Sequence, residues 1–509
     1  MALVVAAAFA DFLAANPSAL GATVRILRYY AYALGGAMAW ALVVALICRA
    51  IGLSGWRGVL VAAVHAFMLF QFDEVQSFLT ASIPAAVDGA SFWVWIAMTL
   101  LLSLVPFFVV RKRQQLLGVV AIAAVLLAIP ARQVLADLAT KSRVLEGEQA
   151  RFEGIVRIRP NVYWIVLDGY PRADILRRDF DFDNAAFLEN IERRGYTVQS
   201  RATSNYATSL DSVANTVGMS YRLTPGPPMG AAPTPLDRYA MVRGRNASVA
   251  QFRRFGYRYV HFSSGYDNMT LCSNEPDACV TGSRGLDEVD VALLSRTPYM
   301  DESLPRGRLT AANEQAFVRG SVADLEAKLP LIQEVPAPFF VYAHILMPHP
   351  PMRVDAECRE IPARPDLRTW DPGNRGKFTD QIACVNRQTL QLLDRLASTD
   401  PEALVVVQAD HGSAFSQPFA RPHDQWTPEQ AEERFAILSA VKLPGSCSGI
   451  DVPDALTSVN TFRVVFSCLT GTVWDLLPPR HFVSPYEPFL DANRGQVVEY
   501  QDLLFVRVR

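Results

Sequence analysis

The sequence predicts two parts, an apolar helical N-terminal region and a large α/β domain built around a mostly parallel sheet. Up to about Arg132 the text is almost continuously apolar, whereas after Gln149 it has ordinary charge. In this second part, runs rich in Val, Ile and aromatic residues alternate with segments of helical periodicity. With 509 residues the chain is too long for one ordinary domain. We expect residues 1–135 to form the helical region, 136–157 a linker, and 158–509 the α/β domain.

Several apolar runs in the first part are long enough to cross a bilayer, which takes about twenty residues per helix. The clear runs are residues 30–48, 59–72, 92–110 and 116–131, and residues 1–15 form a shorter fifth candidate. A cleavable signal peptide would need a basic start and polar sequence after it, and both are missing. Buried helices of a soluble protein are the alternative, but the succession of runs with so few charges favours four or five transmembrane helices.

The basic residues predict the orientation, because positively charged loops stay in the cytoplasm. Residues 111–113 form the densest basic cluster, and Arg49 and Arg57 flank a second loop. One more crossing after this cluster places the α/β domain outside, although Arg25 and Arg28 would then also lie outside, against the rule. The sequence therefore predicts a multi-pass protein of the bacterial inner (cytoplasmic) membrane with a periplasmic or extracellular domain.

Cysteine usage gives an independent indication of the compartment. Six of the seven cysteines lie in the α/β domain, and an even set suggests disulfides in an oxidising environment. Pairing in sequence order is the simplest of about fifteen connectivities. It joins Cys272 to Cys279, Cys358 to Cys384, and Cys447 to Cys468. A zinc cluster is the rival, but no C-x-x-C pair occurs; free structural thiols are a further alternative.

The elements of the α/β domain follow from the spacing of its apolar residues. Strands are expected at residues 161–167, 257–262, 339–346, 404–408 and 435–441, and helices at 184–194, 311–329 and 379–397. The strand runs are continuously apolar, which indicates strands covered on both faces by helices. In such parallel sheets, catalytic residues collect beyond the carboxyl ends of the strands.

Polar residues occur at these strand ends. The strand at 161–167 ends at Asp168, and the strand at 404–408 runs into Asp410 and His411. Residues 204–221 begin as a loop rich in Ser, Asn and Thr and become helical near Leu210. A hydroxyl at that junction would lie at a helix N-terminus, which favours phosphate and alkoxide groups.

Several motifs, in order, resemble the alkaline phosphatase/sulfatase superfamily. The opening strand of that superfamily resembles N-V-Y-W-I-V-L-D-G-Y (161–170), and S-N-Y-x-x-S-x-x-S-V-A-N (204–215) is similar to the nucleophile segment of its membrane-anchored branch. H-I-L-M-P-H-P-P (344–351), V-V-Q-A-D-H-G-S (406–413) and E-R-F-A-I-L-S-A (433–440) follow in the expected order. This branch includes lipoteichoic-acid synthases and phosphoethanolamine transferases. The resemblance covers most of residues 158–445 and implies an α/β/α sandwich of the alkaline-phosphatase type.

The resemblance implies roles for individual residues. Asp168, Asp410 and His411 resemble the metal ligands of the family. The nucleophile segment points to the hydroxyl of Ser209, which would also contact the metal, with Thr208 as the alternative. Without the resemblance, an Asp at a strand end is usually a turn or cap residue, and a Ser-rich loop before a helix is usually an N-cap.

Two histidines and one arginine are further candidates. His349 resembles a catalytic residue that contacts the substrate or leaving group, and His344 is a candidate substrate contact. The alternative is a structural pair of histidines around Pro348. Arg172 is expected at a helix start, with a phosphate contact as the second reading.

Asp oxygens and His nitrogens suit a divalent cation such as Mn²⁺, Zn²⁺ or Mg²⁺, and the residues supply one principal site. Metal coordination would activate the hydroxyl, which is otherwise a poor nucleophile. Attack on phosphorus would give a covalent phospho-enzyme. Residues 209–213 lack the Pro and Arg of the C/S-x-P-x-R signature that directs formylglycine formation in sulfatases, so phosphoryl transfer is expected instead.

Three functions remain open. The first is transfer of a phospho-alcohol group from a membrane lipid or lipid-linked donor to an envelope glycan or lipid. The second is hydrolysis of phosphate or sulfate esters, and the third is a non-catalytic role in envelope assembly. The formal net charge of −2 and the absence of a basic tract exclude a nucleic-acid partner.

Overall fold

The computed structural model describes most of the chain as two compact units. It leaves out residues 16–22, 83–89, 109, 111–114, 145–153, 223–234, 266, 274, 283–287, 299–319, 363–366, 368, 421, 448, 484–497 and 501–509. One unit comprises Met1–Ser142 and Leu286–Asn313, and the other Arg143–Gly285 and Glu314–Arg509. The basic cluster at 111–113, on which the predicted orientation depends, lies outside the described residues.

The first unit consists of apolar helices. These are α1 (Ala2–Ala15), α2 (Thr23–Ala50), α3 (Gly55–Leu69), α4 (Phe72–Ser82), α5 (Ala90–Phe108), α6 (Leu116–Val144) and the later α13 (Glu288–Ser295). By length and composition, Arg25–Ala50 and Leu116–Ala136 are able to cross a bilayer, and α1, α3 and α5 contain shorter apolar stretches. The run predicted at 59–72 is divided between α3 and α4, and α6 continues into the predicted linker.

Close packing and polar contacts hold this unit together. Gly58 of α3 lies so near α2 that an added Cβ would be 2.7 Å from the Cα of Ala45, so the small residue lets the two helices approach. The later helix α13 joins the same unit, because Tyr29 donates a 2.6 Å hydrogen bond to Asp290. Arg296, just after α13, pairs with Asp11 of α1. No pattern in the sequence predicts this association.

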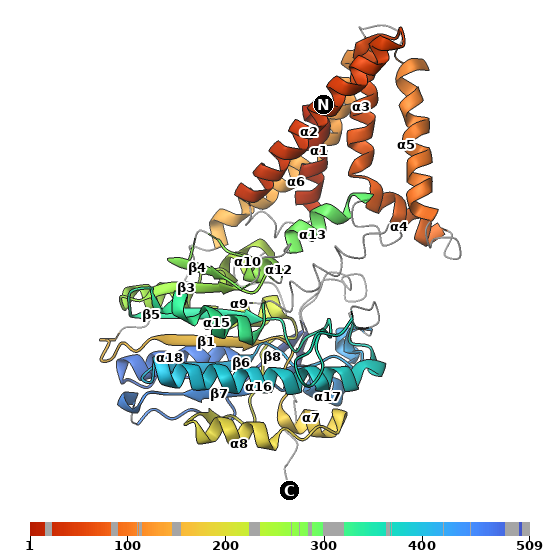
Figure 1. Ribbon diagram of the computed structural model, residues 1–509. Coiled ribbons are helices and arrows are strands. Elements are labelled where there is room, and N and C mark those ends of the chain that lie inside the picture. Colours follow the sequence, from red (N-terminus) through yellow and green to blue (C-terminus); the bar gives the residue numbers. More distant parts are fainter. Residues whose placement is uncertain are drawn as a thin grey trace. The chain divides into compact units, whose positions relative to one another are not determined.

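A seven-stranded sheet forms the centre of the second unit (Figure 1). Its order is β2-β7-β6-β1-β5-β3-β4. The strands are β1 (Val162–Leu167), β2 (Thr197–Val198), β3 (Arg258–Ser263), β4 (Ala278–Thr281), β5 (Phe339–Ile345), β6 (Leu404–Ala409) and β7 (Ser439–Lys442). All pairings are parallel except those of β7 with β6 and β2. This confirms the predicted α/β fold with a mostly parallel sheet. A separate antiparallel pair joins β8 (His481–Val483) to β9 (Val498–Tyr500).

Helices cover both faces of the sheet, because alternate residues of β1 belong to different cores. Tyr163, Ile165 and Leu167 pack with one set of helices: α7 (Ala173–Phe180), α8 (Ala185–Arg193), α15 (Val322–Gln333) and α16 (Arg375–Thr399). Val162, Trp164 and Val166 pack with the other set: α9 (Ser209–Gly218), α10 (Pro235–Val242), α11 (Ala247–Arg254) and α18 (Thr461–Thr470). The short α12 (Asp267–Thr270), α17 (Pro428–Phe435) and several 3₁₀ turns complete the unit.

Two predicted elements differ from the structure. The strand expected at 435–441 begins only at Ser439, because residues up to Phe435 form α17, which Thr427 caps through a capping box with Gln430. The helix expected at 311–329 starts, within the described residues, at Val322, because Ser321 caps it. Residues 311–319 of that prediction lie outside the described residues.

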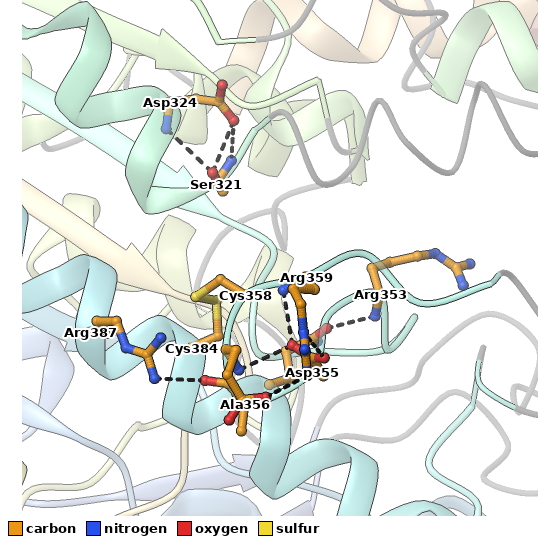
Figure 2. Close-up of a disulfide and its surroundings, with 11 residues drawn as sticks. Ser321, Asp324, Arg353, Asp355, Ala356, Cys358, Arg359, Cys384 and Arg387 are labelled. Carbon is orange, nitrogen blue, oxygen red and sulfur yellow. Dashed lines mark hydrogen bonds and ion pairs between the residues drawn. A yellow bond between two sulfur atoms is a disulfide. The ribbon is translucent and has the colours of Figure 1, made fainter.

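The three disulfides pair in sequence order, as predicted: Cys272–Cys279, Cys358–Cys384 and Cys447–Cys468. Figure 2 shows the second one, which joins the loop after β5 to α16. In the same loop, Arg359 pairs with Asp355 at 2.8 Å. Arg387 of α16 donates to the carbonyl of Ala356 at 3.0 Å. This loop, which begins just after His349, is therefore fastened to α16.

Candidate metal centre and nucleophile

The ends of three adjacent strands bring the predicted ligands together. Strand β1 lies between β5 and β6, and Asp168 follows its last residue. Asp410 and His411 follow β6, and His344 lies near the end of β5 opposite Val166. Because these strands run parallel, their carboxyl ends meet at one edge of the sheet.

The side-chain nitrogens and oxygens of this group approach one another closely. His344 Nε2 is 3.3 Å from Asp168 Oδ2 and 3.6 Å from Asp410 Oδ2. His411 Nε2 is 3.4 Å from Asp168 Oδ1 and 3.5 Å from Asp410 Oδ2. Two sets of three are able to hold a cation, Asp168–His349–His411 and Asp168–His344–Asp410. His344, predicted as a substrate contact, and His349 therefore lie among the candidate ligands.

The carboxylates fit a bound cation. Among the described residues, neither oxygen of Asp168 accepts a hydrogen bond, and neither does Asp410 Oδ2. The other oxygen of Asp410 accepts from the backbone N–H groups of Gly169 at 3.1 Å and His411 at 2.9 Å. Burying carboxylate oxygens without donors is costly, and a divalent cation would supply the missing partner. Asp oxygens with His nitrogens are a ligand set for Zn²⁺ or Mn²⁺.

The protonation states also suit metal binding. Burial raises the pKa of Asp168, but His349, His344 and His411 outweigh it and hold this pKa well below its usual range. Burial lowers the pKa of His411 to about 4, and the nearby Arg434 guanidinium adds to this effect against the opposing carboxylates. Near neutral pH, Asp168 is therefore ionised and His411 neutral, which are the forms that bind metals.

Backbone carbonyls orient two of the imidazoles. His411 Nδ1 donates to Gly412 O at 2.9 Å, and His349 Nδ1 donates to Pro350 O at 2.6 Å. A carbonyl accepts only, so Nδ1 carries the proton and Nε2 has a lone pair in the neutral ring. Contacts of this kind fix the tautomer and direction of metal-binding histidines.

The hydroxyl beside this cluster belongs to Ser209, the first residue of α9. Its Oγ lies 2.9 Å from His411 Nε2. The alternative, Thr208, is the N-cap residue, and its hydroxyl donates to Asp211 at 3.1 Å. Ser212 fastens the helix to the ligand loop by donating to Asp410 O at 2.6 Å. Of the two predicted nucleophiles, the geometry favours Ser209.

The loop after β6 is held by residues that the sequence motif contained but to which no role was assigned. The Glu433 carboxylate, 2 % exposed, accepts from the Ser413 hydroxyl at 2.7 Å and from the N–H groups of Phe415 at 2.6 Å and Ser416 at 3.0 Å. Gly412 packs so tightly that an added Cβ would be 2.0 Å from Glu433 O. The position of Glu433 beside a mostly apolar stretch is the sequence feature that could have indicated this role in holding the loop.

Trp370 lines the same region. Its ring centroid lies 4.8 Å from that of His349, and an added Cβ on Gly169 would be 3.0 Å from the indole. Gly169 has a φ of +69°, which also favours glycine. The half-buried indole therefore rests against the backbone next to Asp168.

Arg172 has other partners. Its guanidinium forms two 2.7 Å hydrogen bonds to Asp174 and a 3.0 Å bond to Ala202 O. These contacts support the predicted role at the start of α7, and the phosphate contact stays a prediction.

A comparison with family models identifies part of this unit. The model described as Sulfatase matches residues 243–442, which include the candidate ligands His344, His349, Asp410 and His411. Residues 243–442 are a sulfatase-family domain. The match confirms the resemblance to the alkaline phosphatase/sulfatase superfamily, and together with the donor set it implies a divalent metal. No curated protein matches the chain.

Solved structures resemble the chain only distantly. The C-terminal periplasmic domain of EptC from Escherichia coli, in complex with Zn, is 9% identical, covers 70% of this chain and 97% of that chain, and has a TM-score of 0.45. The soluble domain of lipooligosaccharide phosphoethanolamine transferase A from Neisseria meningitidis is 11% identical over 62% of this chain and 90% of that chain, with a TM-score of 0.42. The integral membrane form of that transferase is 12% identical, covers 91% and 95% respectively, and has a TM-score of 0.41.

Proposed function

We propose that this protein is a membrane-anchored, metal-dependent phosphoryl-type transferase that acts outside the cytoplasm. It would move a phospho-alcohol group from a membrane lipid or lipid-linked donor to a glycan or lipid of the cell envelope. One observation carries the proposal: the Ser209 hydroxyl lies 2.9 Å from Nε2 of His411, which belongs to the cluster of Asp and His side chains. The missing formylglycine signature favours phosphorus over sulfur as the centre attacked.

The proposed roles are metal binding by the Asp and His residues and nucleophilic attack by Ser209. Asp168, Asp410, His411 and His344 or His349 would hold the cation. The cation would lower the pKa of a bound hydroxyl and offset charge on the phosphoryl oxygens. Ser209 lies at the N-terminus of α9, where the helix dipole favours negative charge.

Two displacements complete the transfer. Ser209 Oγ forms a bond to phosphorus, the bond from phosphorus to the lipid alcohol oxygen breaks, and the lipid alcohol leaves with the proton that Ser209 gives up, while the head-group alcohol stays on phosphorus. An acceptor hydroxyl oxygen then forms a bond to phosphorus, the bond from phosphorus to Ser209 Oγ breaks, and the proton of the acceptor passes to Ser209.

The N-terminal helices support a membrane location. Apolar side chains such as Leu42, Leu101 and Ile122 are 63%, 66% and 65% exposed. Exposed apolar surfaces of this extent fit lipid better than water. Three disulfides in the second unit fit an oxidising compartment, the periplasm of a bacterium. An active site tethered to the membrane would have ready access to a lipid donor.

The test uses full-length protein in lipid nanodiscs that contain a head-group-labelled phospholipid and Mn²⁺ or Zn²⁺. Mass spectrometry of the Ser209 peptide should show the added phospho-alcohol group. Ser209→Ala should abolish both the adduct and turnover, whereas Thr208→Ala should keep most of the turnover. Full turnover in Ser209→Ala, with folding intact, would show that Ser209 is not the nucleophile.

The same experiment separates the alternatives. A label that reaches only water, even when envelope glycolipid is present, would identify a phosphate-ester hydrolase instead. A non-catalytic envelope protein would form no adduct and bind no divalent ion.

A further inference from the structure

The guanidinium of Arg434 connects the two segments that carry the candidate nucleophile and its neighbouring histidine. Arg434 lies in the last turn of α17 and is 4 % exposed. Its Nε donates to Ala207 O at 2.6 Å, and its Nη1 donates to Gly412 O at 2.9 Å. These carbonyls belong to segments about 200 residues apart in the sequence.

Each of the two carbonyls controls one side of the candidate site. Ala207 lies two residues before Ser209 and directly before the N-cap Thr208, so its position sets where α9 begins. The carbonyl of Gly412 also accepts from His411 Nδ1 at 2.9 Å, so it sets the direction in which the imidazole points. The Arg434 guanidinium therefore binds both carbonyls that position the 2.9 Å contact between Ser209 Oγ and His411 Nε2.

The backbone of α17 reinforces this arrangement. Gly412 N donates to Arg434 O at 2.7 Å, so residue 434 contacts the ligand loop through its main chain as well. Ser204 N donates to Phe435 O at 2.8 Å, which ties the other segment to the next residue of the helix. The end of α17 is thus wedged between the two segments, and the guanidinium spans them.

We propose that Arg434 is a positioning residue that aligns the Ser209 hydroxyl with His411 and the candidate metal ligands. The inference rests on the proposed function for its kinetic consequence. Lysine would not replace it, because an ammonium lacks the fixed fork of donors that reaches two carbonyls at once. Misplacement of a nucleophile by about 1 Å costs on the order of 100-fold in rate.

The structure offers a matched control at the opposite end of α9. Arg463 of α18 also bridges two backbone carbonyls of separate segments, those of Asp475 at 2.9 Å and Met219 at 3.0 Å. Met219 is the C-cap residue of α9, so Arg463 supports the same helix far from Ser209. Arg463→Lys removes an equivalent bridge without touching the candidate site.

The experiment measures phospho-enzyme formation by Arg434→Lys and Arg463→Lys in the full-length, metal-loaded protein with a labelled phospholipid. Arg434→Lys should lower the rate constant about 100-fold, with KM and bound metal nearly unchanged. Added guanidinium should restore part of the rate in Arg434→Ala. Arg463→Lys should stay within about threefold of the parent. Equal losses in both lysine variants, or a normal rate in Arg434→Lys, would overturn the positioning role.

If the parent protein forms no phospho-enzyme, the proposed function is wrong. A second measurement tests the role of Arg434 in that case as well. The ¹⁵N resonances of the His411 ring, recorded with Zn²⁺ bound, report its tautomer and neighbours. Arg434→Lys should shift them while Arg463→Lys leaves them in place. Unchanged His411 resonances in Arg434→Lys would refute the alignment role whatever the reaction is.

Discussion

Removal of the Cys358–Cys384 disulfide should both destabilise the protein and impair its site. The cystine closes a loop with a sequence separation of 26, compared with 21 for Cys447–Cys468 and 7 for Cys272–Cys279. The chain-entropy relation then gives losses of about 3.5, about 3.3 and about 2.4 kcal/mol for the respective double alanine variants.

Location distinguishes the Cys358–Cys384 disulfide from the other two. It fastens to α16 the loop that begins after His349 (Figure 2). Gln381 of the same helix donates to Pro348 O at 3.0 Å and His349 O at 3.3 Å. Once the disulfide is lost, the remaining contacts have to hold His349 alone. The Cys358→Ala/Cys384→Ala variant should therefore lose a much larger fraction of the parent's turnover than the Cys272→Ala/Cys279→Ala variant.

Chemical unfolding of the full-length protein in detergent, followed by fluorescence, measures the three stabilities, and turnover is assayed in parallel at a temperature where all variants remain folded. The expected order of destabilisation follows the loop lengths, with the separation of 7 least costly. Loop length would not determine the stabilities if the Cys272–Cys279 variant were the least stable. The Cys358–Cys384 disulfide would not support His349 if its variant kept full turnover.

Further predictions follow from the geometry. Gly412→Ala should lower both metal affinity and turnover, because the added Cβ would lie 2.0 Å from Glu433 O. Calorimetric titration with Zn²⁺ measures the affinity. A Zn²⁺ affinity equal to that of the parent protein would contradict the prediction. Burial lowers the pKa of His481, which bonds Thr203 at 2.9 Å, to about 4, against the effect of Glu499. The pKa of His481 in the unfolded state is near 6.5, so the unfolded state takes up the proton first as the pH falls. The free energy of unfolding should therefore decrease between about pH 6.5 and about pH 4, by up to about 1.4 kcal/mol per pH unit. His481→Gln should flatten this slope in pH-dependent unfolding, and an unchanged slope would show that other groups cause it.

The parts of the fold that could be predicted from the sequence are those in which local pattern and tertiary environment agree. The strands β1, β5 and β6 are continuous apolar runs because both faces of the sheet are covered. Their positions, and the polar residues that follow them, could therefore be predicted from the sequence. The pattern placed Asp168, Asp410 and His411 just beyond strand ends, and the resemblance implied their role as metal ligands. In the structure, His411 Nε2 lies 3.4 Å from Asp168 Oδ1 and 3.5 Å from Asp410 Oδ2.

Residues whose role depends on distant backbone groups could not be predicted. His344 lies inside β5, and only the register with β1 shows that its ring faces the Asp168 carboxylate. Arg434 acts on carbonyls of Ala207 and Gly412, and no local pattern records such contacts. The strand predicted at 435–441 was placed too early for a related reason, since the apolar residues after Phe435 continue from a capped helix before they join the sheet.

The proposed metal site consists of Asp168, Asp410, His411 and a further histidine, which would hold a divalent cation against the Ser209 hydroxyl. Its most direct test is metal analysis of the full-length protein after equilibrium dialysis against Zn²⁺ or Mn²⁺, beside a folded Asp168→Asn/Asp410→Asn variant. The parent protein should hold one tightly bound ion and the variant none. Equal metal content in both proteins, or none in the parent, would contradict this prediction.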